Sequence, residues 1–453
     1  MKRAIYSSLQ LWKNKKRRKP LLLTGARQTG KSWILRHFGR NEFKYTIIID
    51  FEKDTHIARK VNETIQTHGL DVTEILKTVG FDGIEKHSDN TLVVFDEIQR
   101  SPRMFTALKY FKEDRPDVYI AASGSLMGLA LKKNTRAPVG CVDIIEMFPM
   151  TFYEFLEAAG ETEALDMIRE QRWETYLTFR EKLVGRLQQY IVVGGMPDPV
   201  AAFTEGESLE EVRRIQKNIL SIYEDDFNTH SDSQEYTEKL RYAWHIACEL
   251  AGEQNKDKIF YQKMPGKKAA DFYAAVQWLE DCGMISRCYR TKNAGGILGA
   301  NTDYSQADTF RAYPLDTGLR LAASNIPMDV FEKDGSHAFL GFVVEQYVYQ
   351  QLFIEAKRRM IATPAYYVYS GNDGKLEIDF MIADGVNTVP VEVKSQRKFK
   401  NDSFTLFKRR YSPEKMLRIS LRNFGCTPPV WSLPLPMAGS AYDYIAGKGG
   451  DPF

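Results

Sequence analysis

The sequence has few cysteines, no long apolar run and almost no excess of charge of either sign, and each shortage excludes a class of protein. Its five cysteines are scattered and form no C-x-x-C pair, which argues against a disulfide framework or a zinc cluster and predicts reduced thiols. No stretch approaches the roughly 18 apolar residues of a membrane span. The opening segment, MKRAIYSSLQLWKNKKRRKP, holds no apolar run of signal-peptide length. We therefore expect a cytoplasmic protein that does not enter a membrane.

The charge is nearly balanced, with 62 lysines and arginines against 59 aspartates and glutamates and a formal net charge of +3. This balance does not indicate a global surface for polyanions and leaves only local basic patches. The basic run KNKKRRK at 13–19 reads first as a solvated connection and second as a phosphate-facing patch. The 453 residues, 43% of them hydrophobic, predict two to four packed domains at roughly 100–200 residues each.

The clearest motif lies in residues 21–32, LLLTGARQTGKS, where a strand-like run enters the P-loop pattern Gly25-x-x-x-x-Gly30-Lys31-Ser32. Glycines allow such a loop to turn its backbone N–H groups toward one phosphate, and the following helix presents its N-terminus to the same anion. Lys31, expected as a solvent-facing loop residue, would reach the β- and γ-phosphates, and the Ser32 hydroxyl would ligate Mg²⁺. The residues expected to bind ATP are Gly25, Ala26, Arg27, Gln28, Thr29, Gly30, Lys31 and Ser32.

A second motif supports the first. Residues 91–97, TLVVFDE, form an apolar run that ends in two carboxylates, as expected of a buried parallel strand with acids at its C-terminal edge. Asp96 would hold the water shell of Mg²⁺, and Glu97 would polarise the attacking water.

Further apolar runs at 45–51, 118–123 and 142–148 predict three more strands, with helices between them that include 56–67 and 104–112. Alternation of strands and helices predicts a doubly wound parallel sheet that binds nucleotide at the C-terminal ends of its strands.

Two more residues near this edge are candidates for catalysis, beside Lys31 and Glu97. Ser123 closes the fourth strand, where its hydroxyl either senses the γ-phosphate and positions water or only caps the strand end. Arg136 precedes the fifth strand. It either reaches the nucleotide of a neighbouring subunit in a homo-oligomer or is a solvated arginine beside Lys132 and Lys133.

The middle of the chain is rich in helix formers. The apolar spacing in 151–230 predicts a helical lid. Its clearest apolar stripe consists of Leu183, Leu187, Tyr190 and Ile191. The acidic trio at 224–226 reads as a solvated helix face rather than a metal site. From 236 to 291 the order helix, turn, helix and strand resembles a winged-helix domain. This module would either contact DNA or bind protein. The candidates for DNA contact are Lys267, Lys268, Arg287 and Arg290.

The last part of the chain contains a constellation typical of nucleases. Asp379 lies on one predicted strand, and Glu392 and Lys394 lie two residues apart on the next, so the last two share a face. If 384–387 form the hairpin loop, Asp379 pairs with Glu392 and joins that face. Together with Glu345 from a preceding helix, these carboxylates would hold Mg²⁺ against a scissile phosphate, and Lys394 would activate water.

Several motifs follow one another in the order known from one family: GARQTGKS, VVFDEIQRSP, IAASGS, FPMTFYEFLEA and YIVVGGMP. Over nearly its whole length the chain resembles bacterial and archaeal AAA-type ATPases that carry a C-terminal PD-(D/E)xK nuclease-like domain of unassigned function. The resemblance implies ATP and Mg²⁺ as cofactors and a restriction-endonuclease-like fold at the C-terminus. One departure is Gly140-Cys141, because the family often has Gly-Arg before the fifth strand.

We therefore predict an α/β protein with a P-loop NTPase sheet that binds and hydrolyses ATP with Mg²⁺. Its candidate partners are DNA and another protein. The alternatives are an ATP-gated DNA nuclease and a nucleotide switch that binds protein through a catalytically decayed nuclease-like domain. The predicted domains are a P-loop ATPase core (1–150), a helical lid (151–230), a winged-helix-like module (231–330) and a nuclease-like α/β domain (331–453).

Overall fold

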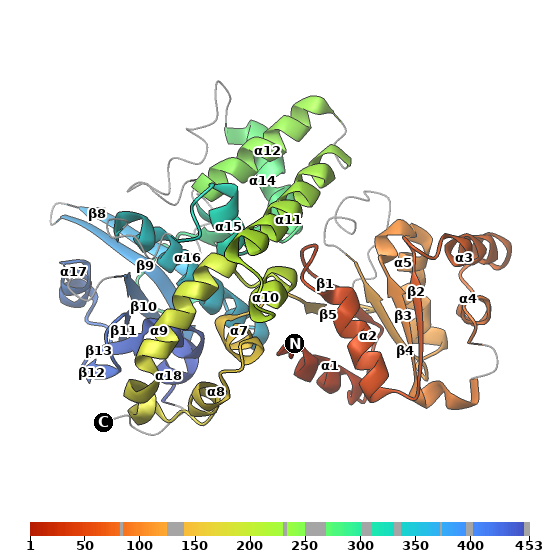
Figure 1. The fold of residues 1–453 in the computed structure, drawn as a ribbon, viewed down its shortest axis with the longest axis horizontal. Coiled ribbons are helices and arrows are strands. Elements are labelled where there is room, and N and C mark those ends of the chain that lie inside the picture. Colours follow the sequence, from red (N-terminus) through yellow and green to blue (C-terminus); the bar gives the residue numbers. More distant parts are fainter. Residues whose placement is uncertain are drawn as a thin grey trace. The chain divides into compact units, whose positions relative to one another are not determined.

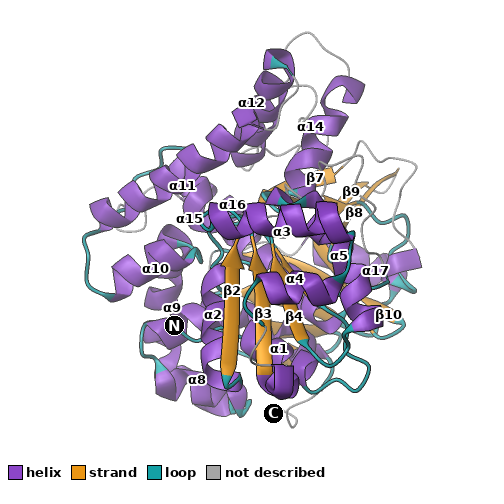
Figure 2. Ribbon diagram, turned by 90° about the vertical axis from the view of Figure 1, so that its right-hand side faces the viewer, coloured by secondary structure: helices purple, strands orange, loops and turns teal. Residues whose placement is uncertain are grey.

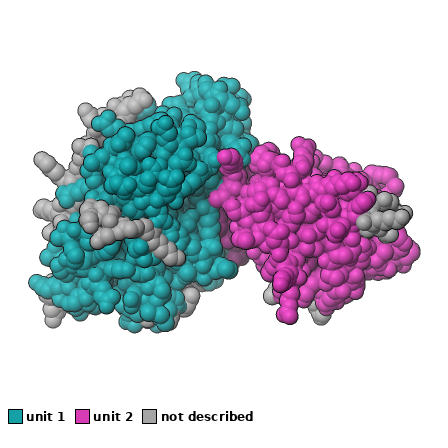
Figure 3. Space-filling model, turned by 90° about the horizontal axis from the view of Figure 1, so that it is seen from below, with its two compact units in different colours: residues 1, 149–280, 285–453 teal, residues 2–148, 281–284 magenta. Residues whose placement is uncertain are grey.

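The computed structural model describes residues 1–81, 85–124, 140–229, 233–249, 269–300, 310–329, 337–371, 374–395 and 402–447 (Figure 1). The chain divides into two compact units (Figure 3). The N-terminal unit comprises residues 2–148 and 281–284, and the C-terminal unit comprises residue 1 and residues 149–280 and 285–453. All five cysteines are free thiols, as the sequence predicted.

The N-terminal unit contains a five-stranded, fully parallel sheet in the order β2-β3-β4-β1-β5. Its strands are β1 (Leu21–Thr24), β2 (Tyr45–Asp50), β3 (Thr91–Asp96), β4 (Tyr119–Ser123) and β5 (Asp143–Glu146). Every residue of β3 is buried, which explains why this central strand reads as a continuous apolar run. The prediction of a parallel α/β sheet is confirmed.

Helices cover both faces of this sheet. They are α1 (Ile5–Lys13), α2 (Lys31–Glu42), α3 (Thr55–His68), α4 (Val72–Thr78) and α5 (Pro102–Asp114), with short 3-10 turns at Glu85–Asn90 and Ile98–Arg100. Side chains alternate along β1, so Leu21 and Leu23 pack with α1 and α2 whereas Leu22 packs with α3, α4 and α5. Figure 2 looks onto the face that α3, α4 and α5 cover.

The basic run at 13–19 is less solvated than predicted. Lys13 makes an ion pair of 3.2 Å with Glu42 of α2, and the Arg18 guanidinium lies 3.5 Å from the centre of the Tyr119 ring. Ion pairing and cation–π contact draw these long side chains onto the fold, because their stems cover apolar surface while their charges find partners.

The C-terminal unit begins with helices α7 (Phe152–Ala158), α8 (Thr162–Arg169), α9 (Tyr176–Val193), α10 (Pro197–Thr204) and α11 (Leu209–Thr229), and a 3-10 turn at Trp173–Thr175. The predicted stripe of α9 is buried in one hydrophobic core that also includes the last sheet of the chain. Asp226 corrects the expectation of a solvated acidic trio, since it is buried on the inner face of α11.

The next segment has the predicted order of two helices and a strand. These are α12 (Gln234–Glu249), α14 (Ala269–Asp281) and β6 (Ile285–Tyr289), followed by a 3-10 turn (Leu298–Ala300), by β7 (Phe310–Pro314) and by α15 (Thr317–Ala323). β6 and β7 pair antiparallel as a two-stranded sheet. This order is compatible with a winged helix, which stays a prediction.

The last sheet has six strands in the order β12-β13-β11-β10-β9-β8 and packs against the long helix α16 (His337–Arg359). The strands are β8 (Ala365–Gly371), β9 (Gly374–Asp384), β10 (Asn387–Lys394), β11 (Met416–Ser420), β12 (Gly425–Thr427) and β13 (Val430–Pro434). Helices α17 (Asp402–Tyr411) and α18 (Ala441–Ile445) and a 3-10 turn (Leu435–Ser440) complete this part.

Two glycines of the YIVVGGMP motif end α9 at a crowded position. A Cβ on Gly194, where φ is +79°, would lie 2.2 Å from the Asp316 carboxylate. Asp316 is fully buried and accepts hydrogen bonds from the N–H groups of Gly195 (2.6 Å) and Leu319 (2.9 Å), the second of which caps α15. Burial raises the pKa of Asp316 to about 6, although these N–H donors oppose the shift.

Candidate nucleotide site

The loop between β1 and α2 has the backbone that the P-loop pattern predicts. Gly25 has φ of +143°, and a Cβ there would lie 2.2 Å from the carbonyl oxygen of Met147, the residue after β5. Gly30 has φ of +93° and lies directly before α2. Both positions therefore require glycine, and the free N–H groups of the first turn of α2 open toward the loop.

Lys31 is the first residue of α2 and is only 6% exposed, which corrects the expectation of a solvent-facing loop residue. The loop wraps around its ammonium group, which donates hydrogen bonds to the carbonyls of Gly25 (3.0 Å) and Ala26 (2.8 Å). Burial lowers the pKa of Lys31 to about 8, while the carboxylates of Glu97 and Asp96 act in the opposite direction. The Lys31 ammonium is therefore hydrogen-bonded to carbonyl oxygens of the loop itself.

Asp96 and Ser123 meet at the C-terminal edge of the sheet. They end the neighbouring strands β3 and β4, and the Ser123 hydroxyl donates a hydrogen bond to Asp96 Oδ1. Asp96 is 2% exposed and Ser123 is fully buried. The serine thus orients the carboxylate proposed to hold the water shell of Mg²⁺. This role differs both from sensing the γ-phosphate and from only capping the strand end, the two roles expected from its sequence position.

Glu97 follows Asp96 in a left-handed conformation, with φ of +51°. Gln99, which sequence reasoning missed, donates a side-chain N–H to Glu97 Oε2 from the short turn after β3. Burial raises the pKa of Glu97, although Gln99 and Lys31 oppose the shift. A carboxylate with a raised pKa is suited to accept a proton from water near neutral pH.

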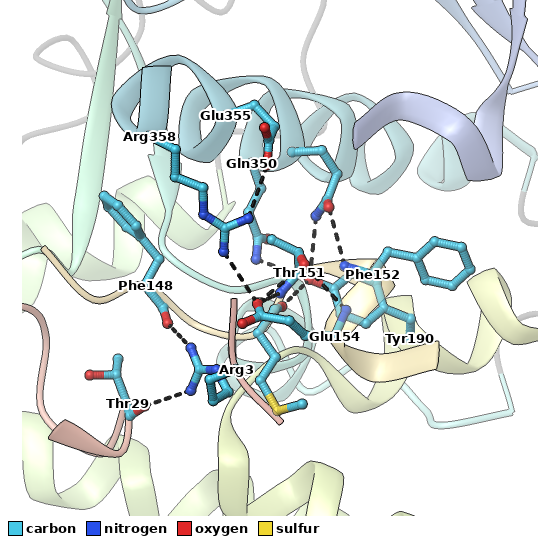
Figure 4. Close-up of polar contacts among 12 residues, drawn as sticks. Arg3, Thr29, Phe148, Thr151, Phe152, Glu154, Tyr190, Gln350, Glu355 and Arg358 are labelled. Atoms are coloured by element: carbon cyan, nitrogen blue, oxygen red, sulfur yellow. Dashed lines mark hydrogen bonds and ion pairs between the residues drawn. The ribbon is translucent and has the colours of Figure 1, made fainter. Parts of the chain in front are cut away.

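Arg3 is a second residue of this site that no motif or spacing in the sequence indicated. Its guanidinium is 7% exposed and donates to the carbonyl of Thr29 in the loop (3.0 Å) and to the carbonyl of Phe148 (2.6 Å) (Figure 4). The hydroxyl of Thr29 in turn donates to the Ala26 carbonyl at 2.9 Å. Three of the loop's carbonyls, those of residues 25, 26 and 29, are thus engaged by donors of this unit.

These features fit a nucleotide with Mg²⁺. Side-chain donors occupy the loop's carbonyls, and a turn that admits only glycine opens the N–H groups of the helix start toward a phosphate. The Ser32 hydroxyl and the Asp96 carboxylate supply the oxygen ligands that Mg²⁺ prefers. Arg136 lies outside the described residues, so its proposed role at a neighbouring subunit stays a prediction.

Two of the residues proposed to contact DNA, Arg287 and Arg290, have partners within the chain. Arg287 is buried and makes an ion pair with Glu280, to which its Nε also donates at 2.7 Å, so its charge is already compensated. The guanidinium of Arg290 donates to the Val368 carbonyl at 2.6 Å. Lys267 and Lys268 lie outside the described residues. The expectation that Arg287 contacts DNA is therefore wrong.

The predicted hairpin brings part of the nuclease-like set together. β9 and β10 pair from Asp384 with Asn387 to Phe380 with Val391, so the predicted register is confirmed and continues toward Asp379 and Glu392. Asp379 Oδ2 accepts the N–H of Val393 at 2.8 Å. Lys394 makes an ion pair with Glu392, whose pKa is raised to about 7 by burial and by the nearby Asp379 carboxylate.

Glu345 has other partners. Tyr313 donates its hydroxyl to Glu345 Oε1 at 2.7 Å, and the Arg311 guanidinium, 2% exposed, lies 3.6 Å from the same oxygen. Within the described parts of the chain, no three His, Cys, Asp or Glu side chains are grouped so that they could hold a metal ion. The predicted metal set of Glu345, Asp379 and Glu392 is not assembled, because Arg311 of β7 already compensates Glu345.

Comparison with known families places this geometry in context. Residues 17–156 match the family model of an AAA domain. Residues 184–329 and 340–427 match two domains of unknown function, DUF8612 and DUF4143. The parallel sheet, the P-loop and the first match agree on the class of fold: this part of the chain is similar to the AAA domain of P-loop proteins.

Three solved structures illustrate how distant the structural likeness is. The Walker-type ATPase PABY2304 of Pyrococcus abyssi is 16% identical with a TM-score of 0.46, over 71% of this chain and 95% of that one. The Aeropyrum pernix ORC2 protein is 13% identical with a TM-score of 0.35, over 73% and 94%. DnaA from Aquifex aeolicus is 12% identical with a TM-score of 0.24, over 61% and 86%. No conclusion about this chain rests on scores this low, and no curated protein sequence matches it.

None of the described helices is both long enough and apolar enough to cross a membrane.

Proposed function

We propose that this protein binds ATP together with Mg²⁺ and hydrolyses it by attack of water on the γ-phosphate. The observation that carries the proposal is the meeting of Lys31, Asp96 and Glu97 at one edge of the sheet, where the two carboxylates act on the pKa of the lysine. These groups follow two different strands, β1 and β3, so the fold rather than local sequence assembles them. The match of residues 17–156 to the AAA domain supports the proposal.

Each of these residues has a defined task in this reaction. The Lys31 ammonium leaves the carbonyls of Gly25 and Ala26 and binds the β- and γ-phosphate oxygens, where it offsets their charge. Ser32 and Asp96 would hold Mg²⁺, which supplies further charge stabilisation when bound. Glu97 leaves its hydrogen bond to Gln99 and orients or deprotonates the attacking water.

The proposal is tested by titrating the purified chain with ATP in a calorimeter and by measuring phosphate release, each with Mg²⁺ and with EDTA. We expect ATP binding, and turnover only when Mg²⁺ is present. An absence of ATP binding by a folded chain would contradict the assignment. Turnover with and without single- and double-stranded DNA then separates an ATPase that acts with DNA, whose rate rises, from a switch that serves protein partners.

A second candidate function is DNA cleavage by the C-terminal unit. It is favoured by one observation, the contact of Glu392 with Lys394 beside Asp379, and it is opposed by the separate pairing of Glu345 with Arg311. The test is Mg²⁺- or Mn²⁺-dependent cleavage of plasmid and linear DNA by the wild type, Asp379→Ala and Lys394→Ala. Cleavage lost in both variants supports a nuclease. Equal residual cleavage in all three means contamination and leaves a nuclease-like binding domain.

A further inference from the structure

The motif FPMTFYEFLEA contains the joint between the two units, which falls between Phe148 and Pro149. On the far side of this joint, Met150 is held through both backbone groups. Its N–H donates to the Gly195 carbonyl at 2.6 Å, and its own carbonyl accepts the Tyr190 hydroxyl at 2.7 Å. Met150 is therefore fixed to the end of α9 by two short hydrogen bonds.

The residues after Met150 are anchored as firmly. Thr151 and Glu154 form a reciprocal capping box at the start of α7, in which the Thr151 N–H donates to Glu154 Oε2 at 2.8 Å. Arg358 of α16 lies 3.5 Å from the same carboxylate oxygen (Figure 4). The Phe152 N–H donates to the Gln351 side chain of the same helix at 3.2 Å. The C-terminal unit thus begins at a rigid point.

On the near side of the joint, Phe148 is held by Arg3. The same guanidinium holds the carbonyl of Thr29, inside the loop that ends at Lys31. A buried arginine that bonds two carbonyls at 2.6–3.0 Å has little freedom, because losing either bond leaves a buried polar group unpaired. A shift of the Thr29 carbonyl must therefore move Arg3 and Phe148 or break a bond.

We infer that Arg3 is a positioning residue of the nucleotide site, and that it transmits the state of the P-loop to the joint at Pro149. The inference rests on the proposed ATP binding and goes beyond it. Only Pro149 separates the residue that Arg3 holds from Met150, and a proline has a fixed φ angle. The covalent link between the two held residues is therefore one residue long with one fixed angle, and we expect a movement of Phe148 to reach the hydrogen bonds of Met150 and Thr151.

The inference is tested by hydrogen–deuterium exchange of the amides of Met150, Thr151 and Phe152, measured with and without saturating ATP and Mg²⁺. In the wild type we expect ATP to change exchange in this segment. In Arg3→Gln we expect ATP affinity to fall by about 10-fold, since a charge-assisted hydrogen bond to the loop is lost, and the change at 150–152 to disappear at saturation. Arg17→Gln removes an exposed arginine of the same segment and serves as the matched control.

Two further variants separate positioning from a merely structural role. Arg3→Lys keeps the charge but offers one nitrogen in place of Nη1 and Nη2, which hold the Thr29 and Phe148 carbonyls separately, so ATP affinity should recover in part while the exchange response stays weak. Pro149→Gly touches neither the loop nor the nucleotide. It should keep wild-type ATP affinity and lose most of the exchange response, because glycine loosens the joint. An unchanged response in both Arg3→Gln and Pro149→Gly would overturn the inference while leaving the proposed ATPase intact. A wild type that binds no ATP would instead contradict the proposed function.

Discussion

The chain carries two clusters in which a lysine lies beside two carboxylates at the end of a strand, one in each unit. In the N-terminal unit, Lys31 bonds to neutral carbonyls of its own loop, and Glu97 bonds to the neutral amide of Gln99. In the C-terminal unit, Lys394 bonds directly to the Glu392 carboxylate. The first cluster keeps its opposite charges apart, whereas the second has already paired them.

This difference has a consequence for ligand binding. A phosphate at the first cluster replaces the contacts of Lys31 to neutral carbonyls with contacts to negatively charged oxygens, so binding gains from the rearrangement of Lys31. A metal ion at the second cluster must displace a bonded ammonium group from a buried carboxylate, which costs part of its binding free energy. The first arrangement is poised for a charged ligand, and the second is closer to a finished structural pair.

The largest expected effect is on turnover at the first cluster. Glu97→Gln keeps the size of the side chain and removes the charge that polarises water. ATP should still bind, and phosphate release should fall by about 10²–10⁴-fold, as for a lost general base. Turnover near the wild-type rate would show that another residue prepares the water. Glu52→Gln, an exposed glutamate of the same unit, is the control.

Loss of the lysine should strongly weaken ATP binding, which precedes the hydrolysis step. Lys31→Ala removes the charge that the loop reserves for phosphate, and ATP affinity should fall by about 100-fold or more, as expected when a buried charge loses its partner. The measurement is titration calorimetry against Lys16→Ala, which removes an exposed lysine. Wild-type affinity in Lys31→Ala would contradict the P-loop assignment. Because Lys31 is buried, we also expect the melting temperature of Lys31→Ala without ATP to differ from that of the wild type.

At the second cluster the expected effect is on stability. Lys394→Ala leaves Glu392 buried beside Asp379 with the charge of Arg418 but without its bonded ammonium group, and the free energy of unfolding should fall by about 1–3 kcal/mol at pH 8. The loss should be smaller at pH 5.5, because the pKa of Glu392 is raised to about 7 already in the wild type and the protonated group needs no partner. Urea unfolding at both pH values measures it, with Lys375→Ala on the same sheet as control. An equal loss at both would mean that packing, not charge, is affected.

The last expected effect is a gradual change with pH and concerns the buried carboxyl of Asp316. Asp316 has a pKa of about 6 in the folded chain and 3.8 as a free group, so folding favours its protonated form. Its contribution to stability is complete below about pH 4 and is lost as the pH rises through 6. The slope reaches about 1.4 kcal/mol per pH unit between these values. Asp316→Asn cannot titrate at this position, so the difference in the free energy of unfolding between wild type and variant should change with pH by this slope. Parallel curves would show that the carboxyl is not shifted.

The fold of the N-terminal unit follows from its sequence because the interior strands β1, β3 and β4 are almost wholly buried and so appear as apolar runs. The P-loop follows equally well, since its glycines are fixed by local backbone geometry. In the last sheet the turn between β9 and β10 brings Asp384 opposite Asn387, which is the register that a hairpin loop at 384–387 implies. These features depend on neighbours in sequence.

The side-chain partners could not be predicted because they come from distant segments. Arg3 reaches Thr29 and Phe148 from the start of the chain, and Arg311 of strand β7 reaches Glu345 of helix α16. No spacing rule connects such pairs, since their contact exists only after the elements have packed. Gln99 is close to Glu97 in sequence, but their hydrogen bond depends on the left-handed backbone conformation of Glu97, which the sequence does not indicate.

The close approach of Gly25 to Met147 limits how this chain can change by mutation. The atom that a side chain at position 25 would meet is a backbone oxygen, which every residue at position 147 carries. No second substitution can therefore relieve the clash. At Gly194 the nearby atoms belong to the Asp316 side chain, which a shorter residue would withdraw, but the φ of +79° would still strain any other residue. Both positions therefore require glycine, the first through a neighbouring backbone oxygen as well as its φ, and the second through its own φ even when its neighbour changes.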